Sequence, residues 1–414
     1  MSITISQSPT FPNGTQSDMI YVIQGTFAGQ PQHRYICKII NNGNTLATVK
    51  QVANQSSYGV FEVSRLLDDH MGYETPWLVS GSVPYTNSTN NNVNQFQIEF
   101  AEEYGTSNTS PIVSSSFVSA SAESNSQVIP AVTERNSGTF NWPSSSYDAL
   151  TNASNKVTTV DSTTIQEALV ISGSDYMTIS SLCGIAPKGH WDKTRIDVYN
   201  TSLTSIYNTS FTNPYSHVPI TNKLLHAGIG PANLQNVGSL ASYFGDPNQY
   251  PYYTIELDYS GGNSDKYLFN LGCLYQKGAN FAFINKLGVY DYYRAALVDT
   301  ERESFDRSTY QAPYIDYSTT TSTIAFDYAK RGETQYLNKI QNNYTTETNW
   351  LTTKQATWLF ELFESPSVFV QVNQHFEPII ITNANEEYRT NVMGQRMFKF
   401  TISYRTANNK HSRY

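Results

Sequence analysis

Apolar and polar residues alternate with a period of two in several stretches of the chain, the spacing that puts apolar side chains on one face of a β-strand. Positions 35, 37 and 39 are apolar in this way, and residues 41–44 (Asn-Asn-Gly-Asn) then supply a turn, so that 45–49 can return as the second strand of a hairpin. Similar patterns predict further strands at 96–100, 254–259, 281–285, 368–372, 378–382 and 398–404.

One long stretch, at about 353–364, has the periodicity of a helix instead. Its apolar positions fall at i, i+3, i+4 and i+7 (Ala356, Leu359, Phe360 and Phe363). Thr352 and Thr353 can cap its start, and Pro366 stops it soon after. Ser64 can cap a second, short helix. The predicted fold is mainly β, with multi-domain, β-sandwich-like antiparallel sheets, one C-terminal capping helix and a long Ser-rich loop or linker.

The periodic pattern disappears between about 105 and 164, where serines are dense. This stretch is typical of a linker or long loop that lies over a neighbouring surface, and an exposed interaction arm is the alternative. We therefore expect an N-terminal β domain at 1–104, a Ser/Thr/Asn-rich linker or interaction arm at 105–164, and β-rich C-terminal structure at 165–414.

The composition limits the classes of function that the protein can have. Only 14% of the 414 residues are charged, against about 25% in an average domain. A net charge of -8 offers no basic footprint for nucleic acid. No run approaches the roughly 18 apolar residues of a membrane span. The N-terminus lacks the features of a signal peptide, and Cys37, Cys183 and Cys273 are expected to be small buried hydrophobes in a protein made in a reducing cytoplasm.

Sequence motifs for chemistry are missing. The seven histidines show no metal-ligand spacing, and no nucleophile-elbow, phosphate-loop or dinucleotide motif occurs. Asp68, Asp69 and His70 are adjacent but more typical of solvated residues. We therefore predict no catalytic residue, no cofactor, no metal and no enzyme. A pair of glycosidase carboxylates stays open, because any two acids about 5 to 10 Å apart in the fold would qualify.

Thirty tyrosines stand out, in two dense groups. Tyr290, Tyr292 and Tyr293 form the denser group, and Tyr252 and Tyr253 belong to the second. A tyrosine offers an apolar face and a hydroxyl at little entropic cost, which suits contact with a carbohydrate or protein partner. These five residues are therefore the candidate partner contacts. The alternative is structural: tyrosines also line strands and fill seams between domains.

Three stretches carry a family resemblance. Residues 283–292 resemble the strand-turn pattern W-L-N-R-x-G-G-Y-D, and residues 58–67 resemble the pattern Y-G-V-F-D-I-S-R-I-L. The most specific stretch, from 331 to 383, resembles R-G-E-T-x-Y, then W-L-T-E-E-E-S-E-W-L-E-E-L-x-x-S-P-E-V, then P-V-I-I-T-D. Together they resemble a family of virion structural proteins of tailed phages that infect Bacteroidetes, with crAss-like phages as candidate members. Most family glutamates are missing from the helix, and 105–164 has no counterpart.

The resemblance implies a structural component of the virion, in the tail or head-tail region, with no catalytic residues. We expect a subunit that assembles in the host cytoplasm with copies of itself and with other tail or neck proteins, as a ring or sleeve. Low charge with many Tyr, Asn and Thr residues suits broad, partly polar interfaces. A receptor- or carbohydrate-binding tail protein, using its tyrosines on a host surface glycan, is the alternative; a glycan-degrading tail enzyme is a third.

Overall fold

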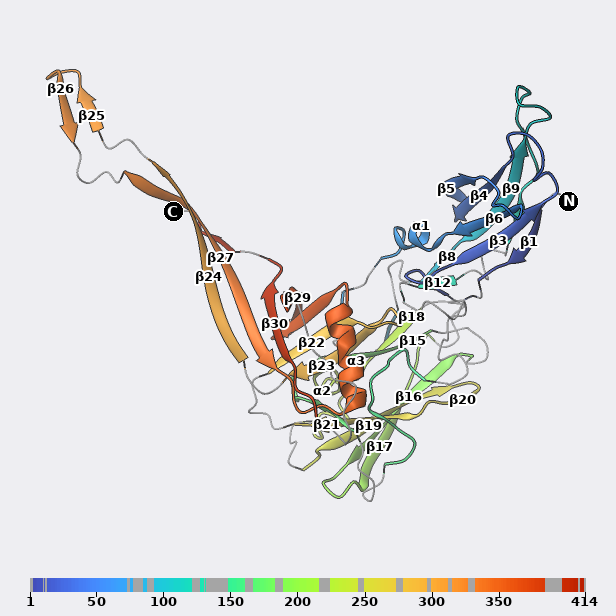
Figure 1. Ribbon diagram of the computed structural model, residues 1–414. Coiled ribbons are helices and arrows are strands. Elements are labelled where there is room, and N and C mark those ends of the chain that lie inside the picture. The colour runs from blue at the N-terminus through green and yellow to red at the C-terminus, as the bar shows by residue number, and fades with distance from the viewer. Residues whose placement is uncertain are drawn as a thin grey trace. The chain divides into compact units, whose positions relative to one another are not determined.

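In the computed structural model, the chain forms two compact units (Figure 1). The first comprises Met1–Leu274, Phe283–Tyr292 and Phe360–Ser365, and the second Tyr275–Ala282, Tyr293–Leu359 and Pro366–Tyr414. These bounds differ from the predicted division at 104 and 164. The structure describes residues 3–9, 11, 13–72, 75–76, 85–87, 93–120, 127–129, 131, 148–160, 167–182, 189–215, 224–244, 249–272, 278–295, 299–311, 315–326, 332–383, 397–408 and 410–412.

Strands make up 53% of the structure and helices 7%, which confirms the mainly β prediction with several antiparallel sheets. There are three short helices among the described residues, of which the C-terminal one is the longest. In the part of the chain that is described, no helix is long and apolar enough to cross a membrane.

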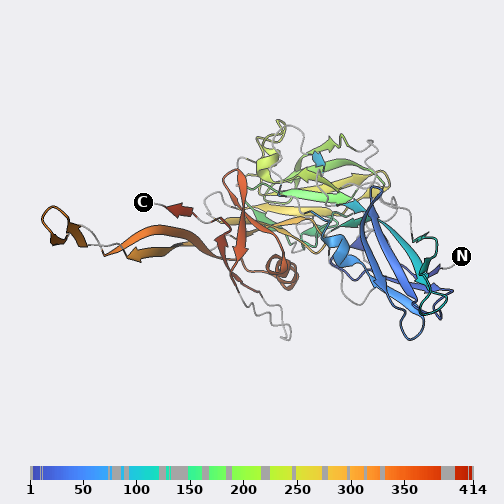
Figure 2. The ribbon, with the colours of Figure 1, turned by 90° about the horizontal axis from the view of Figure 1, so that it is seen from above.

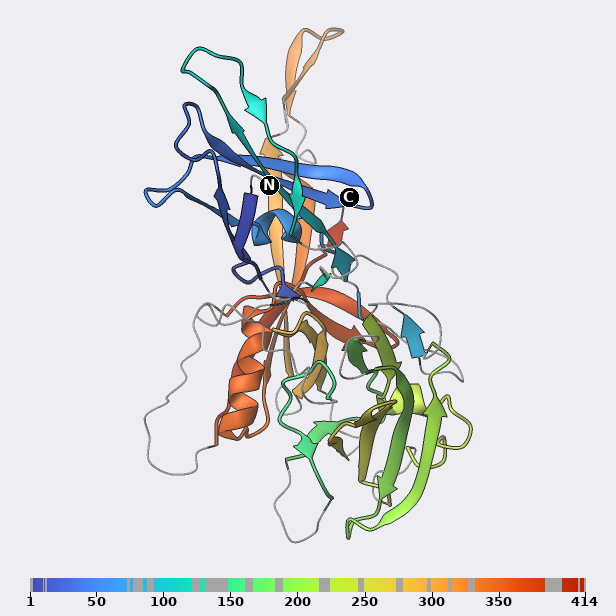
Figure 3. The same ribbon diagram turned by 90° about the vertical axis from the view of Figure 1, so that its right-hand side faces the viewer.

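A β-sandwich forms the N-terminal part of the first unit (Figure 3, blue to cyan). One sheet has the order β1-β3-β6 and the other β10-β9-β4-β5, with β11 also on β9. Their bounds are β1 Ile3–Gln7, β3 Ile20–Gly25, β4 Arg34–Asn41, β5 Asn44–Gln51, β6 Tyr58–Glu62, β9 Gln97–Tyr104, β10 Val113–Ser114 and β11 Val118–Ser119. Tyr21 and Phe61 from the first sheet pack on Phe100 from the second, in one shared core.

The predicted hairpin of this sandwich is confirmed. β4 and β5 pair antiparallel, and Asn42 and Gly43 between them have φ of 49° and 76°. Two consecutive positive φ values define the turn that matches the twist of a tight hairpin, and an Asn-Gly pair adopts it readily. Cys37 of β4 is a free, buried thiol, and burial raises its pKa to about 12. Cys183 and Cys273 lie outside the described residues.

Ser64 does not cap the first helix as predicted. It is the first helical residue of α1 (Ser64–Asp68), and Val63 occupies the N-cap position without a side-chain hydrogen bond. The Ser64 amide donates instead to Glu62 Oε1 at 2.8 Å. The carboxylate two residues upstream therefore satisfies a free amide of the first turn.

Parts of the Ser-rich stretch add strands to sheets of the first unit. β10 and β11 both pair antiparallel with β9, with Val113 opposite Tyr104 and Val118 opposite Phe100. β13 (Lys156–Val157) pairs with β21 (Lys266–Leu271). Where they are described, these segments of the stretch therefore lie along sheets of the first unit. Within this stretch, residues 121–126, 130, 132–147 and 161–164 lie outside the described part.

A seven-stranded sheet dominates the rest of the first unit. Its order is β13-β21-β19-β16-β17, with β14 on β21 and β20 on β19. The remaining sheets are β15-β18-β7 and β2-β12-β8. Bounds not yet given are β2 Asn13–Gly14, β7 Tyr85–Asn87, β8 Asn94–Gln95, β12 Gln127–Ile129, β14 Leu169–Ile171, β15 Thr178–Leu182, β16 Trp191–Tyr199, β17 Ser205–Thr212, β18 Leu224–Gly228, β19 Tyr252–Tyr259, β20 Gly262–Asn263 and α2 Pro231–Leu234.

An eight-stranded sheet forms most of the second unit, in the order β23-β22-β28-β29-β30-β27-β24 with β31 on β27. The strands are β22 Ala279–Ile284, β23 Tyr290–Ala295, β24 Asp299–Gln311, β27 Glu333–Glu347, β28 Val368–Val372, β29 His375–Ile381, β30 Thr401–Thr406 and β31 Lys410–Ser412, and a separate hairpin pairs β25 Ile315–Ser318 with β26 Thr323–Phe326. The predicted last strand starts at 401 rather than 398, because Phe398 bridges Leu351 instead.

The long helix α3 spans Thr353–Glu364 as predicted. Thr352 and Gln355 form a capping box at its start: the Gln355 amide donates to Thr352 Oγ1 at 3.3 Å, and the Thr352 amide donates to Gln355 Oε1 at 3.1 Å. Trp358 lies edge-on to Tyr293 of β23, with ring centroids 6.1 Å apart. The helix thus packs on the end of the sheet, which is the capping position expected for it.

Replacing Thr352 by alanine removes one acceptor of this capping box. We expect the free energy of unfolding to fall by about 1 kcal/mol, measured by chemical denaturation followed by circular dichroism. Lys354→Ala, an exposed change in the same turn, is the matched control and should leave the unfolding free energy within about 0.5 kcal/mol of wild type. Equal losses in both variants would contradict the capping role.

Candidate functional site

Strands β24 and β27 form a long antiparallel ribbon, called the arm below. They pair from Asp299 opposite Thr346 to Gln311 opposite Glu333. At about 3.4 Å per residue, the 13 residues of β24 span about 44 Å. Figures 1 and 2 show the arm continuing well beyond β28, β29 and β30 of its own sheet.

The sequence of the arm favours extended backbone without a hydrophobic core. Neither strand contains glycine or proline. Thr, Tyr and Ile fill six of the 15 positions of β27, whereas six of the 13 residues of β24 are charged. Cross-strand bonds fix the pairing: the Tyr344 hydroxyl donates to Glu301 Oε1 at 3.0 Å, and Thr309 Oγ1 donates to Glu333 Oε1 at 2.7 Å. At the base, the Tyr344 ring stacks on Tyr404 of β30 at 5.1 Å.

The two edges of the arm differ. β27 is covered on its second edge by β30 along Asn343–Glu347 and by β31 along Asn338–Ile340. β24 stands at the end of the sheet, and no described strand pairs with its other edge. An uncovered edge presents a row of backbone amides and carbonyls to which another strand can bind.

Large apolar side chains project from the arm into solvent. Phe305, Tyr310 and Tyr336 are 50%, 51% and 52% exposed. Tyr336 is the extra residue of a bulge, because Ser308 pairs with Leu337 while Thr309 pairs with Gln335. In the β25–β26 hairpin, Ile315, Tyr317 and Ile324 are also exposed. Exposed apolar groups concentrated on one element mark an interaction surface.

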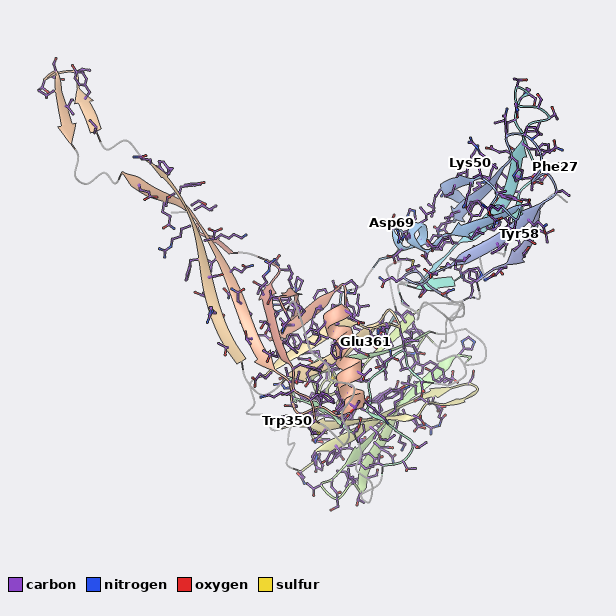
Figure 4. All side chains as sticks on the ribbon, in the orientation of Figure 1. Phe27, Lys50, Tyr58, Asp69, Trp350 and Glu361 are labelled. Carbon is purple, nitrogen blue, oxygen red and sulfur yellow. The ribbon has the colours of Figure 1, made fainter. Side chains whose placement is uncertain are left out.

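A further apolar site of the second unit lies beside the start of α3. Trp350 is 61% exposed and Met397 is 55% exposed, and each is next to a residue of the Leu351–Phe398 bridge. Figure 4 labels Trp350 just before the helix. Tryptophan is the residue type most enriched among the anchors of protein interfaces.

Four of the five predicted partner contacts are inside the protein. Tyr290, Tyr292, Tyr293 and Tyr253 are all buried, so the prediction that they contact a partner is wrong for these four. Tyr292 shares a 2.8 Å hydroxyl bond with Thr178, and Tyr293 accepts a bond from the Asn349 amide at 3.2 Å. Desolvation raises the phenol pKa of both. The structural alternative therefore accounts for these four, and Tyr252 is half-buried on β19.

Another set of tyrosines does reach the surface of the first unit. Tyr207 of β17 stacks on Tyr243 at 4.6 Å, and Tyr243 meets Tyr250 edge-on at 5.2 Å. All three rings are only partly buried. Tyr250 lies beside the predicted pair Tyr252 and Tyr253, and Tyr243 is seven residues before it. Tyr207 is distant in sequence, so the chain alone could not reveal the whole cluster.

The adjacent residues Asp68, Asp69 and His70 are either bonded within the fold or exposed to solvent. Asp68 accepts a 2.6 Å bond from Thr15 Oγ1, while Asp69 and His70 are exposed, as solvated residues would be. Among the residues that the structure describes, no group of three or more His, Cys, Asp or Glu side chains could hold a metal ion.

Glu361 of α3 is the most perturbed carboxyl. Its side chain, labelled in Figure 4, accepts hydrogen bonds from the Lys286 amide and from Asn152 Nδ2, both at 2.9 Å. Burial, and then the neighbouring Asp291, raise its pKa. Asn285 completes the surroundings by donating to the Leu150 carbonyl at 3.0 Å. These hydrogen bonds join segments of the first unit to one another, so the role of Glu361 is structural.

The arm was missed from the sequence, although one signal was present. Both strands lack glycine, proline and apolar periodicity over 13 and 15 residues. A strand without an apolar face cannot pack against a hydrophobic core. The missing apolar face could therefore have indicated an exposed ribbon.

Comparisons with known proteins add little. No protein-family model matches the chain, and no curated protein matches it. Among solved structures, a marsupial T cell receptor is similar over 83% of this chain and 96% of its own, with 8% sequence identity and a TM-score of 0.20. A TM-score that low carries no argument about fold or function.

Glu361 makes a pH dependence testable. Its raised folded pKa means that the folded state binds the proton more tightly, so its contribution to stability is full below the ordinary value of 4.5 and is lost as pH rises through the folded pKa. In denaturation curves at a series of pH values, Glu361→Gln should therefore lose most stability relative to wild type near pH 4 and less toward pH 7. Glu364→Gln, exposed on the same helix, is the control, and a pH-independent difference for Glu361→Gln would contradict the raised pKa.

Proposed function

We propose that the protein is a non-enzymatic structural component of a phage virion, which assembles with copies of itself and with other virion proteins into a ring or sleeve of the tail or head-tail region. The family resemblance of 58–67, 283–292 and 331–383 supports the virion role. The arm supports assembly, and it is the single observation that carries the proposal.

The arm supports assembly because it is difficult to stabilise alone. An isolated two-stranded hairpin is at best marginally stable in water, and three strands or a packed face are needed. Near its tip, Glu333–Leu337 of β27 pairs only with β24 among the described strands. Burying the exposed halves of Phe305, Tyr310 and Tyr336 against a partner would contribute about 1 kcal/mol each.

A triple substitution of Phe305, Tyr310 and Tyr336 by serine tests this role. We expect the full chain to lose the oligomers that wild type forms, because the apolar contacts of the arm are gone, while the cores keep their stability. Light scattering coupled to size-exclusion chromatography and negative-stain microscopy measure the oligomers, and thermal unfolding measures the fold.

Val52→Ser is the matched control, because Val52 is also exposed but lies just after β5, in the N-terminal sandwich. It should assemble as wild type does. A wild-type chain that stays monomeric at every concentration and is absent from virions would refute the proposed function.

The second candidate is a receptor- or carbohydrate-binding tail protein, and the Tyr207, Tyr243 and Tyr250 cluster favours it. Three partly exposed aromatic rings within 5.2 Å of their neighbours offer the flat apolar faces and hydroxyls that suit a sugar ring. The cluster lies in the first unit and the arm in the second, so the two functions can be tested separately.

For this candidate, Tyr207→Ala and Tyr250→Ala should each reduce glycan-array or host-cell binding at least about tenfold, because each removes a ring from the platform. Tyr310→Ala on the arm is the control and should bind normally. No wild-type binding to host cells or their glycans would exclude the second candidate.

A further inference from the structure

The uncovered edge of β24 carries a definite order of charges. From residue 301 onward the charged residues read Glu301, Arg302, Glu303, Asp306 and Arg307, and all five side chains are exposed. Because side chains directly opposite each other across two antiparallel strands interact, this order decides which strand can pair with the edge and in which register.

A second β24 fits the first when the two run antiparallel with Ser304 opposite Ser304. In that register Glu301 faces Arg307 of the second copy and Arg302 faces its Asp306. Two-fold symmetry repeats both pairs, so four opposite-charge pairs form and no like charges face each other.

Other registers are worse. If the centre of the pairing moves by half a residue, like charges lie opposite each other. Glu301 then faces Asp306 in one direction of the move, and Arg302 faces Arg307 in the other. Centring on Phe305 keeps only the two Glu303–Arg307 pairs. Parallel pairing in register places every charge opposite itself.

The same register buries apolar surface. Phe305 faces Glu303 of the second copy, and the two Phe305 rings become diagonal neighbours, which are about 7 to 8 Å apart and within reach of aromatic side chains. Phe305 is half exposed on the arm, so the contact covers a side chain that lacks a full partner in the described chain.

Other described edge strands match less well. The long ones at the ends of their sheets, β5 and β17, have 8 residues each, against 13 for β24. β17 carries no charge and β5 carries only Lys50. Neither can offer the mixture of positive and negative charges that β24 presents.

We infer that the arms of two copies of this chain join by antiparallel pairing of β24 with β24, centred on Ser304, into one continuous sheet. This deepens the proposed function, on which it rests, by naming one contact between copies. A two-fold contact of this kind closes at two copies, so a ring requires a second, heterologous contact besides it.

Two variants of the full chain test the pairing. Arg302→Asp places an aspartate opposite Asp306 of an identical copy, and Asp306→Arg places an arginine opposite Arg302. Each alone should weaken β24-mediated association about tenfold, measured by sedimentation velocity over a concentration series at low and physiological salt. Lys354→Asp, an exposed charge change on α3, should have no effect.

Mixing the two variants is the decisive step. In a mixed pair, the introduced aspartate of the Arg302→Asp chain faces the introduced arginine of the Asp306→Arg chain. The unchanged Asp306 of the first chain faces the unchanged Arg302 of the second, so both contacts are again of opposite sign. The mixture should associate as tightly as wild type, a recovery that damage to the fold in either variant would not produce.

Cross-linking tests the register independently. In pairing centred on Ser304, the two copies of this residue face each other, whereas Ser308 faces Thr300 of the second copy. Oxidation should therefore cross-link Ser304→Cys chains through residue 304, but not Ser308→Cys chains, relative to oxidised wild type.

The outcomes separate this inference from the proposed function. If wild type assembles but the mixture gives no recovery and Ser304→Cys no cross-link, the β24 pairing is wrong while the proposed function stands. If wild type forms no assemblies at all, both are wrong. Recovery in the mixture, with the residue-304 cross-link, supports both.

Discussion

Unpaired backbone at the edge of β24 is the constraint on which the proposed behaviour of this protein depends. A strand can satisfy only half of its amides and carbonyls through one neighbour, and β24 has only β27 beside it among the described strands. Water satisfies the rest at little cost, but the half-exposed Phe305 and Tyr310 gain from being covered. The unpaired backbone and the exposed aromatic rings together favour contact of this edge with another strand over contact with water.

The low charge of the chain has an explanation inside the protein, and the arm is an exception to it. Inside, tyrosine replaces purely apolar residues and bonds through its hydroxyl: Tyr259 with Ser181 at 2.7 Å, Tyr253 with the Ile229 carbonyl at 3.0 Å, and Tyr267 with the Ala149 amide at 2.8 Å. Such tyrosines join strands to other strands or to loops without ionic groups. The arm departs from this low charge, because six of the 13 residues of β24 are charged, and in the proposed pairing their signs select a partner and a register rather than add stability.

The sequence predicted the elements that carry a local signal, including β22, which is buried along its whole length, but it missed the burial of the β23 tyrosines and the arm. The 35–49 hairpin and the 353–364 helix follow from apolar spacing and from Asn-Gly and Thr-x-x-Gln signals, which act locally. β23 is buried along its whole length, so its tyrosines show no alternation, and their dense run suggested a surface patch. The arm buries neither face fully and shows no apolar period. The cluster of Tyr207, Tyr243 and Tyr250 depends on tertiary contacts that no local pattern encodes.

Hydrogen exchange of the β24 amides as a function of protein concentration tests the central claim most directly. In dilute, unassembled protein, amides of 299–311 that point away from β27 should exchange rapidly, since no described strand accepts from them. The account predicts that these amides become protected as the chain assembles, while the paired amides change little. Assembly that leaves every amide of 299–311 exchanging at its dilute rate would contradict it.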